Sequence, residues 1–184
     1  MRISVTLLQY DHGIIRQVMD VISELFRSNR TERHVGEFKE AMVFLERFLD
    51  RFHHEKEERF LFKAAAVECP KVSESLVKLE KEHALAREIM GNVLRALDEG
   101  KLPDAERETR RLVDLMTVHI SEEENMVFPV IENSLQLETD AKVRDQSVRF
   151  MEREFGKNYQ QVAESFANDI QERLLGPGFF KGIV

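Results

Sequence analysis

Long stretches of the chain carry apolar residues at alternating intervals of three and four positions. The first of these stripes passes through Val5, Leu8, His12, Ile15, Met19, Ile22 and Phe26. Such spacing is typical of a helix that packs one face into a bundle. Glycine and proline, which interrupt helices, occur only 8 and 4 times in 184 residues, so the segments between them are long. We therefore predict an all-α protein.

The same pattern occurs four times along the chain. The second stripe starts after Thr31 and contains Phe38, Met42, Leu45, Leu49, His53, Glu57, Phe60 and Ala64. The third contains Leu76, Leu79, His83, Ala86, Met90, Val93 and Leu97. The fourth contains Ala105, Thr109, Leu112, Met116, His119, Glu123, Val127 and Val130. Four consecutive helices of this kind predict an up-down-up-down four-helix bundle over residues 1–135.

Composition argues against several classes of partner. The 27 basic and 34 acidic residues give a net charge of −7 and are interspersed, which disfavours a nucleic-acid groove or an anionic membrane surface as partner. No apolar run reaches the roughly 18 residues that span a bilayer. The beginning, MRISVTLLQYDH, becomes polar too early for a secretory signal, and the single Cys69 cannot form an internal disulfide. We expect a cytoplasmic protein with one sizeable core.

Every stripe is interrupted by a histidine, and in two stripes a glutamate follows one turn later. An unpaired buried polar group costs roughly 2–7 kcal/mol, so something must satisfy these side chains. Residues four positions apart on a helix face the same direction. His53 with Glu57, and His119 with Glu123, are therefore spaced to bind a metal ion together.

An internal repeat relates the two halves of this pattern. The segment DHGIIRQVM around His12 aligns with EHALAREIM around His83. A His-x-x-x-Glu motif follows in each half, 41 residues after His12 at His53 and 36 residues after His83 at His119. Two helical hairpins related by a pseudo-twofold axis would bring four imidazoles and two carboxylates together. Two metal ions fit this set.

The predicted ligand types limit the choice of metal. Imidazole and carboxylate without thiolate favour iron, with manganese or zinc as alternatives. Two carboxylates carry a charge of −2 against +4 for two divalent ions, so an oxo or hydroxo bridge would lower the remaining charge in a dry core. At least one ion would keep an open coordination position, where dioxygen or nitric oxide could bind.

These motifs resemble the hemerythrin-like, or HHE cation-binding, domain family, whose members are four-helix bundles with a non-haem di-iron site. The likeness extends roughly from Leu8 to Ser134 and includes HHEKEERFLF in the second stripe and HISEEENMVFP in the fourth. The resemblance implies terminal histidine ligands and two bridging glutamates, namely His12, His53, His83, His119, Glu57 and Glu123.

The chain differs from the oxygen-carrying members of that family at Leu79, where they have a histidine. Their second acid is an aspartate five residues after its histidine, whereas Glu123 follows His119 by four. The chain is more similar to the branch with four histidines and two glutamates, which is associated with iron sensing, nitric oxide or oxygen responses, and iron-centre repair. We therefore expect a di-iron protein that binds or senses dioxygen or nitric oxide, or that handles iron.

A second ligand register competes with the first. His54 and Glu58 are displaced from the predicted ligands by one residue, which turns an α-helix by about 100°. Alignment of Phe62 with Phe128 favours His53 over His54 as the ligand.

Other readings of the same residues stay open. A redox enzyme acting on nitric oxide, oxygen or peroxide, or repairing iron centres, is one alternative, and a metal-free helical interaction module is another. No residue is assigned a catalytic role. A ferritin-like site would need two Glu-x-x-His motifs, and only Glu80 with His83 provides one. Arg16 and Arg87 either steady carboxylates or, as we expect, form exposed ion pairs.

Residues 136–184 fall outside the repeat. Apolar residues between Thr139 and Leu175 predict one or two further helices with a break at Gly156. We expect this extension to pack on or beside the bundle. The final GPGFFKGIV either caps the bundle or docks on a partner, so the extension is a candidate surface for a homo-oligomer or a protein partner.

Overall fold

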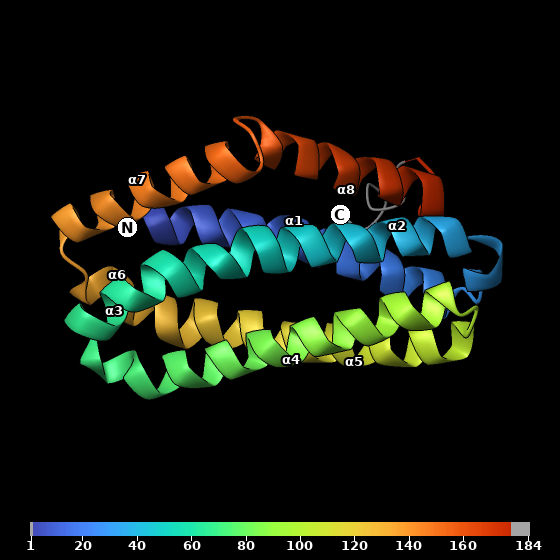
Figure 1. Cartoon of the computed structure of the whole chain (residues 1–184), viewed down its shortest axis with the longest axis horizontal. Coiled ribbons are helices and arrows are strands. Elements are labelled where there is room, and N and C mark those ends of the chain that lie inside the picture. The colour runs from blue at the N-terminus through green and yellow to red at the C-terminus, as the bar shows by residue number, and fades with distance from the viewer. Residues whose placement is uncertain (1, 178–184) are drawn as a thin grey trace.

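Antiparallel helices form the body of the molecule. The computed structural model describes residues 2–177, and this part of the chain contains helices and no strand. The α-helices are α1 (Ile3–Arg27), α2 (Val35–Leu45), α3 (Phe62–Glu68), α4 (Ser73–Asp98), α5 (Leu102–Glu122), α6 (Phe128–Ser134), α7 (Leu137–Glu154) and α8 (Tyr159–Leu175). Four rods alternate in direction: α1, the run from α2 to α3, α4, and the run from α5 to α6 (Figure 1). The predicted all-α, up-down-up-down bundle is confirmed.

Two rods change helix type where predicted ligands lie. The second rod contains the π-helical segments η2 (Glu46–His54) and η3 (Glu57–Leu61), and the fourth contains η5 (Glu123–Val127). The short 3₁₀ turns η1 (Thr31–Arg33) and η4 (Pro70–Val72) lie between rods. π-helical turns are rare, occur mostly as short interruptions of α-helices and are frequent at functional sites. Because a π-turn is wider than an α-turn, it rotates successive residues by less than about 100°.

Two apolar clusters fill the bundle and leave a polar layer between them. Leu8 and Leu79 belong to one cluster, and Ile15 and Ala86 belong to the other. His12 therefore separates the clusters on α1, and His83 separates them on α4. Burying one large apolar side chain stabilises a fold by roughly 1.5–3 kcal/mol, so two extensive clusters can hold a polar layer between them.

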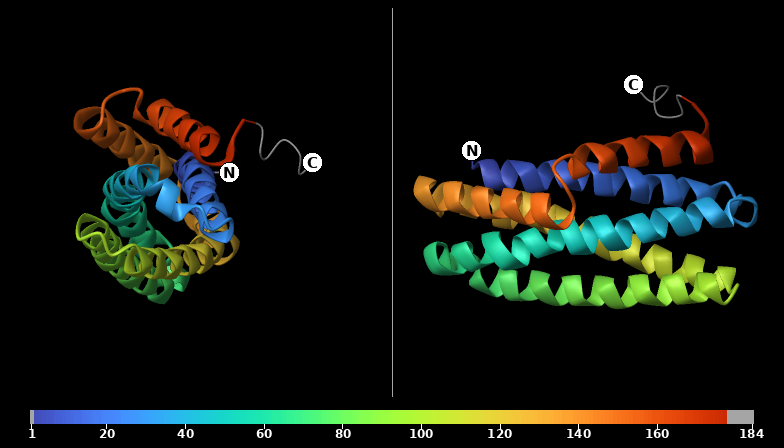
Figure 2. Two further views of the ribbon diagram at one scale, coloured as in Figure 1. Left: turned by 90° about the vertical axis from the view of Figure 1, so that its right-hand side faces the viewer. Right: turned by 45° about the horizontal axis from the view of Figure 1, so that its top comes forward.

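The helices α7 and α8 lie outside the bundle, along α1 (Figure 2). The chain breaks between them at Phe155–Asn158, where Gly156 has φ +93, a conformation that glycine adopts without strain. The predicted break is thus present. Aromatic contacts fix α8 in place: Phe166 stacks on Phe44 with ring centroids 4.4 Å apart. The predicted roles of the last seven residues concern a segment outside the described residues.

The start of α1 is tied to α7 by one carboxylate. Asp140 accepts hydrogen bonds of 3.1 Å from the backbone nitrogens of Ile3 and Ser4, and one of 2.5 Å from the Ser4 hydroxyl. The first N–H groups of a helix lack partners within the helix and favour negative charge. Asp140 in α7 provides these N–H groups with both a hydrogen-bond acceptor and a negative charge.

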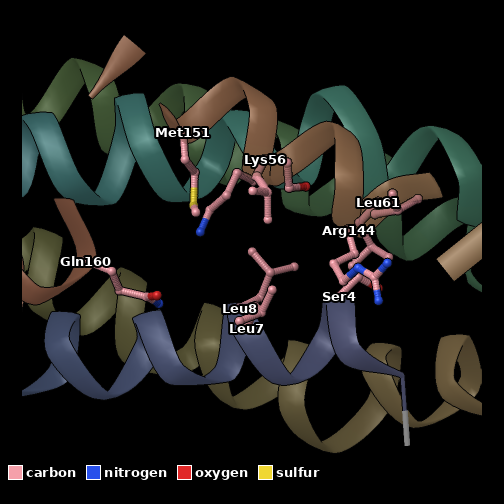
Figure 3. Close-up of a pocket in the computed structure, with 11 residues that line it drawn as sticks. Ser4, Leu7, Leu8, Lys56, Leu61, Arg144, Met151 and Gln160 are labelled. Atoms are coloured by element: carbon pink, nitrogen blue, oxygen red, sulfur yellow. The ribbon is translucent and has the colours of Figure 1, made fainter. Parts of the chain in front are cut away.

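A small pocket lies between the bundle and the outer helices α7 and α8. Lys56 and Met151 face Leu7 and Leu8 across it, and Gln160 lies at one end (Figure 3). The walls are mostly apolar, whereas the Lys56 side chain brings a charge into it. The outer helices therefore cover a polar feature of the bundle as well as apolar surface.

Candidate metal centre

The four predicted histidines form two close pairs. The Nε2 atoms of His12 and His53 lie 3.0 Å apart, and those of His83 and His119 lie 3.1 Å apart. All four side chains are fully buried. Each pair joins the first rod of a hairpin to its second rod, as the internal repeat requires. The structure thus brings the predicted histidines together.

The two predicted glutamates lie between the pairs. Glu57 has one carboxylate oxygen 3.5 Å from Nε2 of His53 and the other 3.5 Å from Nε2 of His83. Glu123 reaches the remaining histidines in the same way, at 3.2 Å from His12 and 3.3 Å from His119. Both carboxylates are fully buried, and their oxygens have no hydrogen-bond partner among residues 2–177. Each carboxylate thus has one oxygen near each histidine pair.

Each of the four histidines makes an outward contact through Nδ1 to a second carboxylate. The partners and distances are Glu124 to His12 at 2.9 Å, Glu58 to His83 at 2.9 Å, Glu82 to His119 at 2.8 Å and Asp11 to His53 at 3.3 Å. Such a carboxylate fixes the tautomer of a metal-binding histidine, because Nδ1–H donates outward and Nε2 keeps its lone pair.

This orientation of the imidazoles bears on whether a cation fits between the two Nε2 atoms of each pair. With Nδ1 as donor, the two Nε2 atoms of a pair would direct lone pairs at each other across 3.0 Å, which is unfavourable unless a cation or proton lies between them. Two nitrogens bound at right angles to one ion, each at about 2.1 Å, are separated by about 3.0 Å. The spacing within each pair therefore suits neighbouring ligands of one metal ion.

Two arginines hold the outer carboxylates in position. Arg16 donates to Glu124 at 2.9 and 2.6 Å, and Arg87 donates to Glu58 at 2.5 Å. Both arginines are partly exposed, so the expected exposed ion pairs are present. The carboxylate of each pair also contacts a predicted ligand histidine.

His54 also faces the interior. It is fully buried, and its ring stacks on His83 with centroids 3.7 Å apart. His53 and His54 are alternatives only if the segment is α-helical, but η2 is π-helical up to His54, so the angle between the two side chains is smaller than in an α-helix. Both histidines therefore point inward.

The two halves differ in what covers their outer carboxylates. Asp11 is fully buried and is contacted by the Lys56 ammonium and by Gln160, which donates at 2.9 Å. Lys56 is also buried, with its Nζ 3.9 Å from the centroid of the Phe52 ring. The equivalent Glu82 is partly exposed. The buried Lys56–Asp11 pair was not predicted from the sequence. The only feature that pointed to it is a lysine directly after the HHE motif.

The protonation of these groups follows from burial and charge. Burial lowers the pKa of His53 to about 3 and also lowers the pKa of His54 and His83, which keeps these imidazoles neutral. Burial together with the neighbouring carboxylate of Glu123 raises the pKa of Glu57 well above its usual range. Two carboxylates in a dry core thus resist joint ionisation unless cations accompany them.

Some residues weighed in the sequence lie outside this centre. Glu80 is exposed, so the single Glu-x-x-His motif supplies no ligand from its glutamate. Leu79 is fully buried within an apolar cluster. Within the described residues, no helix is long and apolar enough to cross a membrane.

Fold and site together define a cation-binding helical bundle with paired histidines around two shared carboxylates. Comparison with protein families gives a specific result: the family model described as the hemerythrin HHE cation binding domain matches residues 4–131. The chain belongs to this family. Comparisons with curated proteins and with solved structures find no match.

Proposed function

We propose that this chain is a non-haem di-iron protein. The observation that supports it most is the position of the Glu57 and Glu123 carboxylates, because each has one oxygen near each histidine pair. The residues that would hold the ions are His12, His53, Glu57 and Glu123 for one, and Glu57, His83, His119 and Glu123 for the other. A metal-free interaction module would leave these buried groups without compensation.

The donor atoms favour iron over other first-row metals. Nitrogen and carboxylate oxygen suit iron, with manganese or zinc as alternatives, whereas copper(I) prefers sulfur. Cys69 is buried in an apolar cluster and does not belong to any of the candidate ligand groups. When bound, two irons would supply redox chemistry and coordination positions for an added ligand.

The surroundings of the site support a small uncharged ligand such as dioxygen or nitric oxide. All six proposed ligands are fully buried. Phe128 stacks on His12 and Phe62 on His83, each with ring centroids 5.8 Å apart. A site enclosed by buried ligands and aromatic rings favours a small ligand over a large substrate. The chain's function in this proposal is to bind or sense a diatomic molecule, or to handle iron.

Anaerobic purification of protein expressed with ample iron tests the proposal. We expect about two iron ions per chain by elemental analysis and an optical spectrum that changes on exposure to air or nitric oxide. Circular dichroism on the same preparation checks that the bundle is folded. Folded protein with less than half an ion per chain, across repeated preparations, would overturn the proposal.

A further inference from the structure

A row of arginines lies on the outer face of the second rod. Arg47, Arg51 and Arg59 are exposed, and Glu55 occupies the remaining place in the same four-residue spacing. Residues four apart on a helix share a face, so these side chains leave the bundle on one side. His53, two positions after Arg51, is buried and points to the proposed metal centre instead. The rod that carries predicted ligands inside thus presents a charged row outside.

This row forms one wall of a hollow that α7 completes, here called the arginine pocket. It has a volume of about 430 Å³, and its charged lining residues are Arg47, Arg51, Arg59, Arg153, Glu55 and Glu154. Phe150 and Phe155, near the break between α7 and α8, provide an apolar part of the wall. Four positive and two negative side chains leave a formal charge of +2, in a chain whose net charge is −7. A hollow lined by an excess of one charge attracts ligands of the opposite sign.

The two glutamates do not neutralise all four arginines. Each glutamate already accepts a hydrogen bond from a nearby arginine, at 2.8 Å from Arg59 and at 2.6 Å from Arg153. Among the described residues, Arg51 has no carboxylate oxygen nearer than 3.9 Å, and Arg47 has none within 4.0 Å. Two guanidinium groups therefore face the pocket without a close negative partner.

Aromatic rings hold two of the guanidinium groups in place. The Arg47 guanidinium lies 5.7 Å from the ring centroid of Phe155 and 5.4 Å from that of Tyr159. The Arg59 guanidinium lies 4.9 Å from the ring centroid of Phe150. A guanidinium that rests on a ring uses its flat face for that contact, which leaves the N–H donors at its edge free for a ligand. Ordering these side chains in advance lowers the entropy cost of binding.

Another charged hollow, at the turn between α4 and α5, has balanced charges. It has a volume of about 230 Å³, and its charged lining residues are Arg95, Lys101, Arg107, Glu99, Asp104 and Glu108. Three basic and three acidic side chains cancel, and Lys101 and Arg107 pair with carboxylates at 2.7 and 2.6 Å. The excess of positive charge in the arginine pocket is therefore not a general feature of the charged hollows on this surface.

We propose that the arginine pocket binds a small molecule that carries a phosphate group. A phosphate monoester has a charge of about −1.5 to −2 near pH 7, which matches the excess charge of the lining. Its three terminal oxygens can accept from several guanidinium groups, whereas one bidentate arginine satisfies a carboxylate. The pocket volume lies within the roughly 300–1,000 Å³ that is usual for small-molecule sites. The inference does not depend on the proposed di-iron function.

Titration calorimetry of the full chain with inorganic phosphate, AMP and adenosine tests the proposal. We expect saturable binding of phosphate and of AMP with Kd below about 1 mM at low salt, and no binding of adenosine. Tighter binding of AMP would assign the pocket to an organic phosphate, and equal affinities would mean that the phosphate group alone is recognised. Absence of saturable binding of both phosphate and AMP would overturn the proposal, and so would adenosine binding as tight as that of AMP.

Charge-removing variants locate the binding site. The double variant Arg47→Gln/Arg51→Gln should weaken AMP binding by about tenfold or more, because it removes the two arginines without a close carboxylate. Arg153→Gln alters the pocket from α7 and leaves the ring contacts of Arg47 intact, so it gives an independent reading in the same direction. Arg95→Gln removes one charge from the balanced hollow and should change nothing.

All samples are matched for iron content, so that binding of phosphate to iron cannot produce a difference between them, and circular dichroism confirms their fold. Unchanged AMP affinity in the folded double variant would overturn the proposal, as would an equal loss in Arg95→Gln.

Discussion

Gln160 in α8 donates a 2.9 Å hydrogen bond to Asp11 in α1, and Asp11 in turn contacts Nδ1 of His53 at 3.3 Å. This contact links the helices outside the bundle to the proposed metal centre. The same carboxylate is paired with Lys56. Although burial favours the neutral acid, the Lys56 charge and the contact with His53 together lower the pKa of Asp11. Asp11 is therefore a buried anion whose partners come from the second rod and from α8.

Replacing Lys56 should destabilise the protein strongly. Lys56→Met keeps most of the side-chain volume but leaves the Asp11 charge buried without its cation, which costs about 3–5 kcal/mol when one partner of a buried pair is removed. Urea unfolding of metal-free protein measures the loss. The exposed Lys63 in the same rod provides the control, and Lys63→Met should change little. A loss below 1 kcal/mol in Lys56→Met would show that Asp11 does not need this partner.

The outer carboxylates should contribute to metal affinity without binding metal. Glu82 accepts from Nδ1 of His119 at 2.8 Å, so Glu82→Ala removes the group that orients this imidazole. We expect iron affinity to fall about 10–100-fold, as measured by competition with a chelator. Glu80 lies on the same helix but is exposed, and Glu80→Ala should have no effect. Similar affinities for the two variants would contradict the orienting role.

Attachment of α7 to the bundle should depend on pH through Glu68. The Gln136 backbone N–H and the Thr139 hydroxyl donate to this carboxylate at 2.7 and 2.5 Å and lower the pKa of Glu68. A lowered folded-state pKa means that the stabilisation is present above the usual glutamate pKa and is lost as pH falls through the folded-state value. The melting-temperature difference between wild type and Glu68→Gln should therefore be largest near neutral pH and shrink in acid. A difference that grows in acid would contradict this assignment.

The repeated motifs predicted which helices meet and which six side chains converge, because helical spacing fixes the face on which a residue lies. The same rule failed at His54, because it assumes an α-helix and the chain is π-helical there. The contact of Gln160 with Asp11 could not be predicted either. It depends on how α8 lies across α1, which no local pattern in either segment determines. The ligand roles of the six residues, as distinct from their convergence, stay predictions.

The outer helices also have a consequence for the order in which the centre is completed during synthesis. Every proposed ligand precedes Glu124, whereas Met151 and Gln160, which cover the Lys56 side, lie at least 27 residues later. Chains emerge from the ribosome amino terminus first, and earlier segments begin to fold before later ones are made. A nascent chain thus presents its complete ligand set while that side of the bundle is still open. In the proposed di-iron protein, iron can therefore enter before α7 and α8 cover the Lys56 side of the bundle.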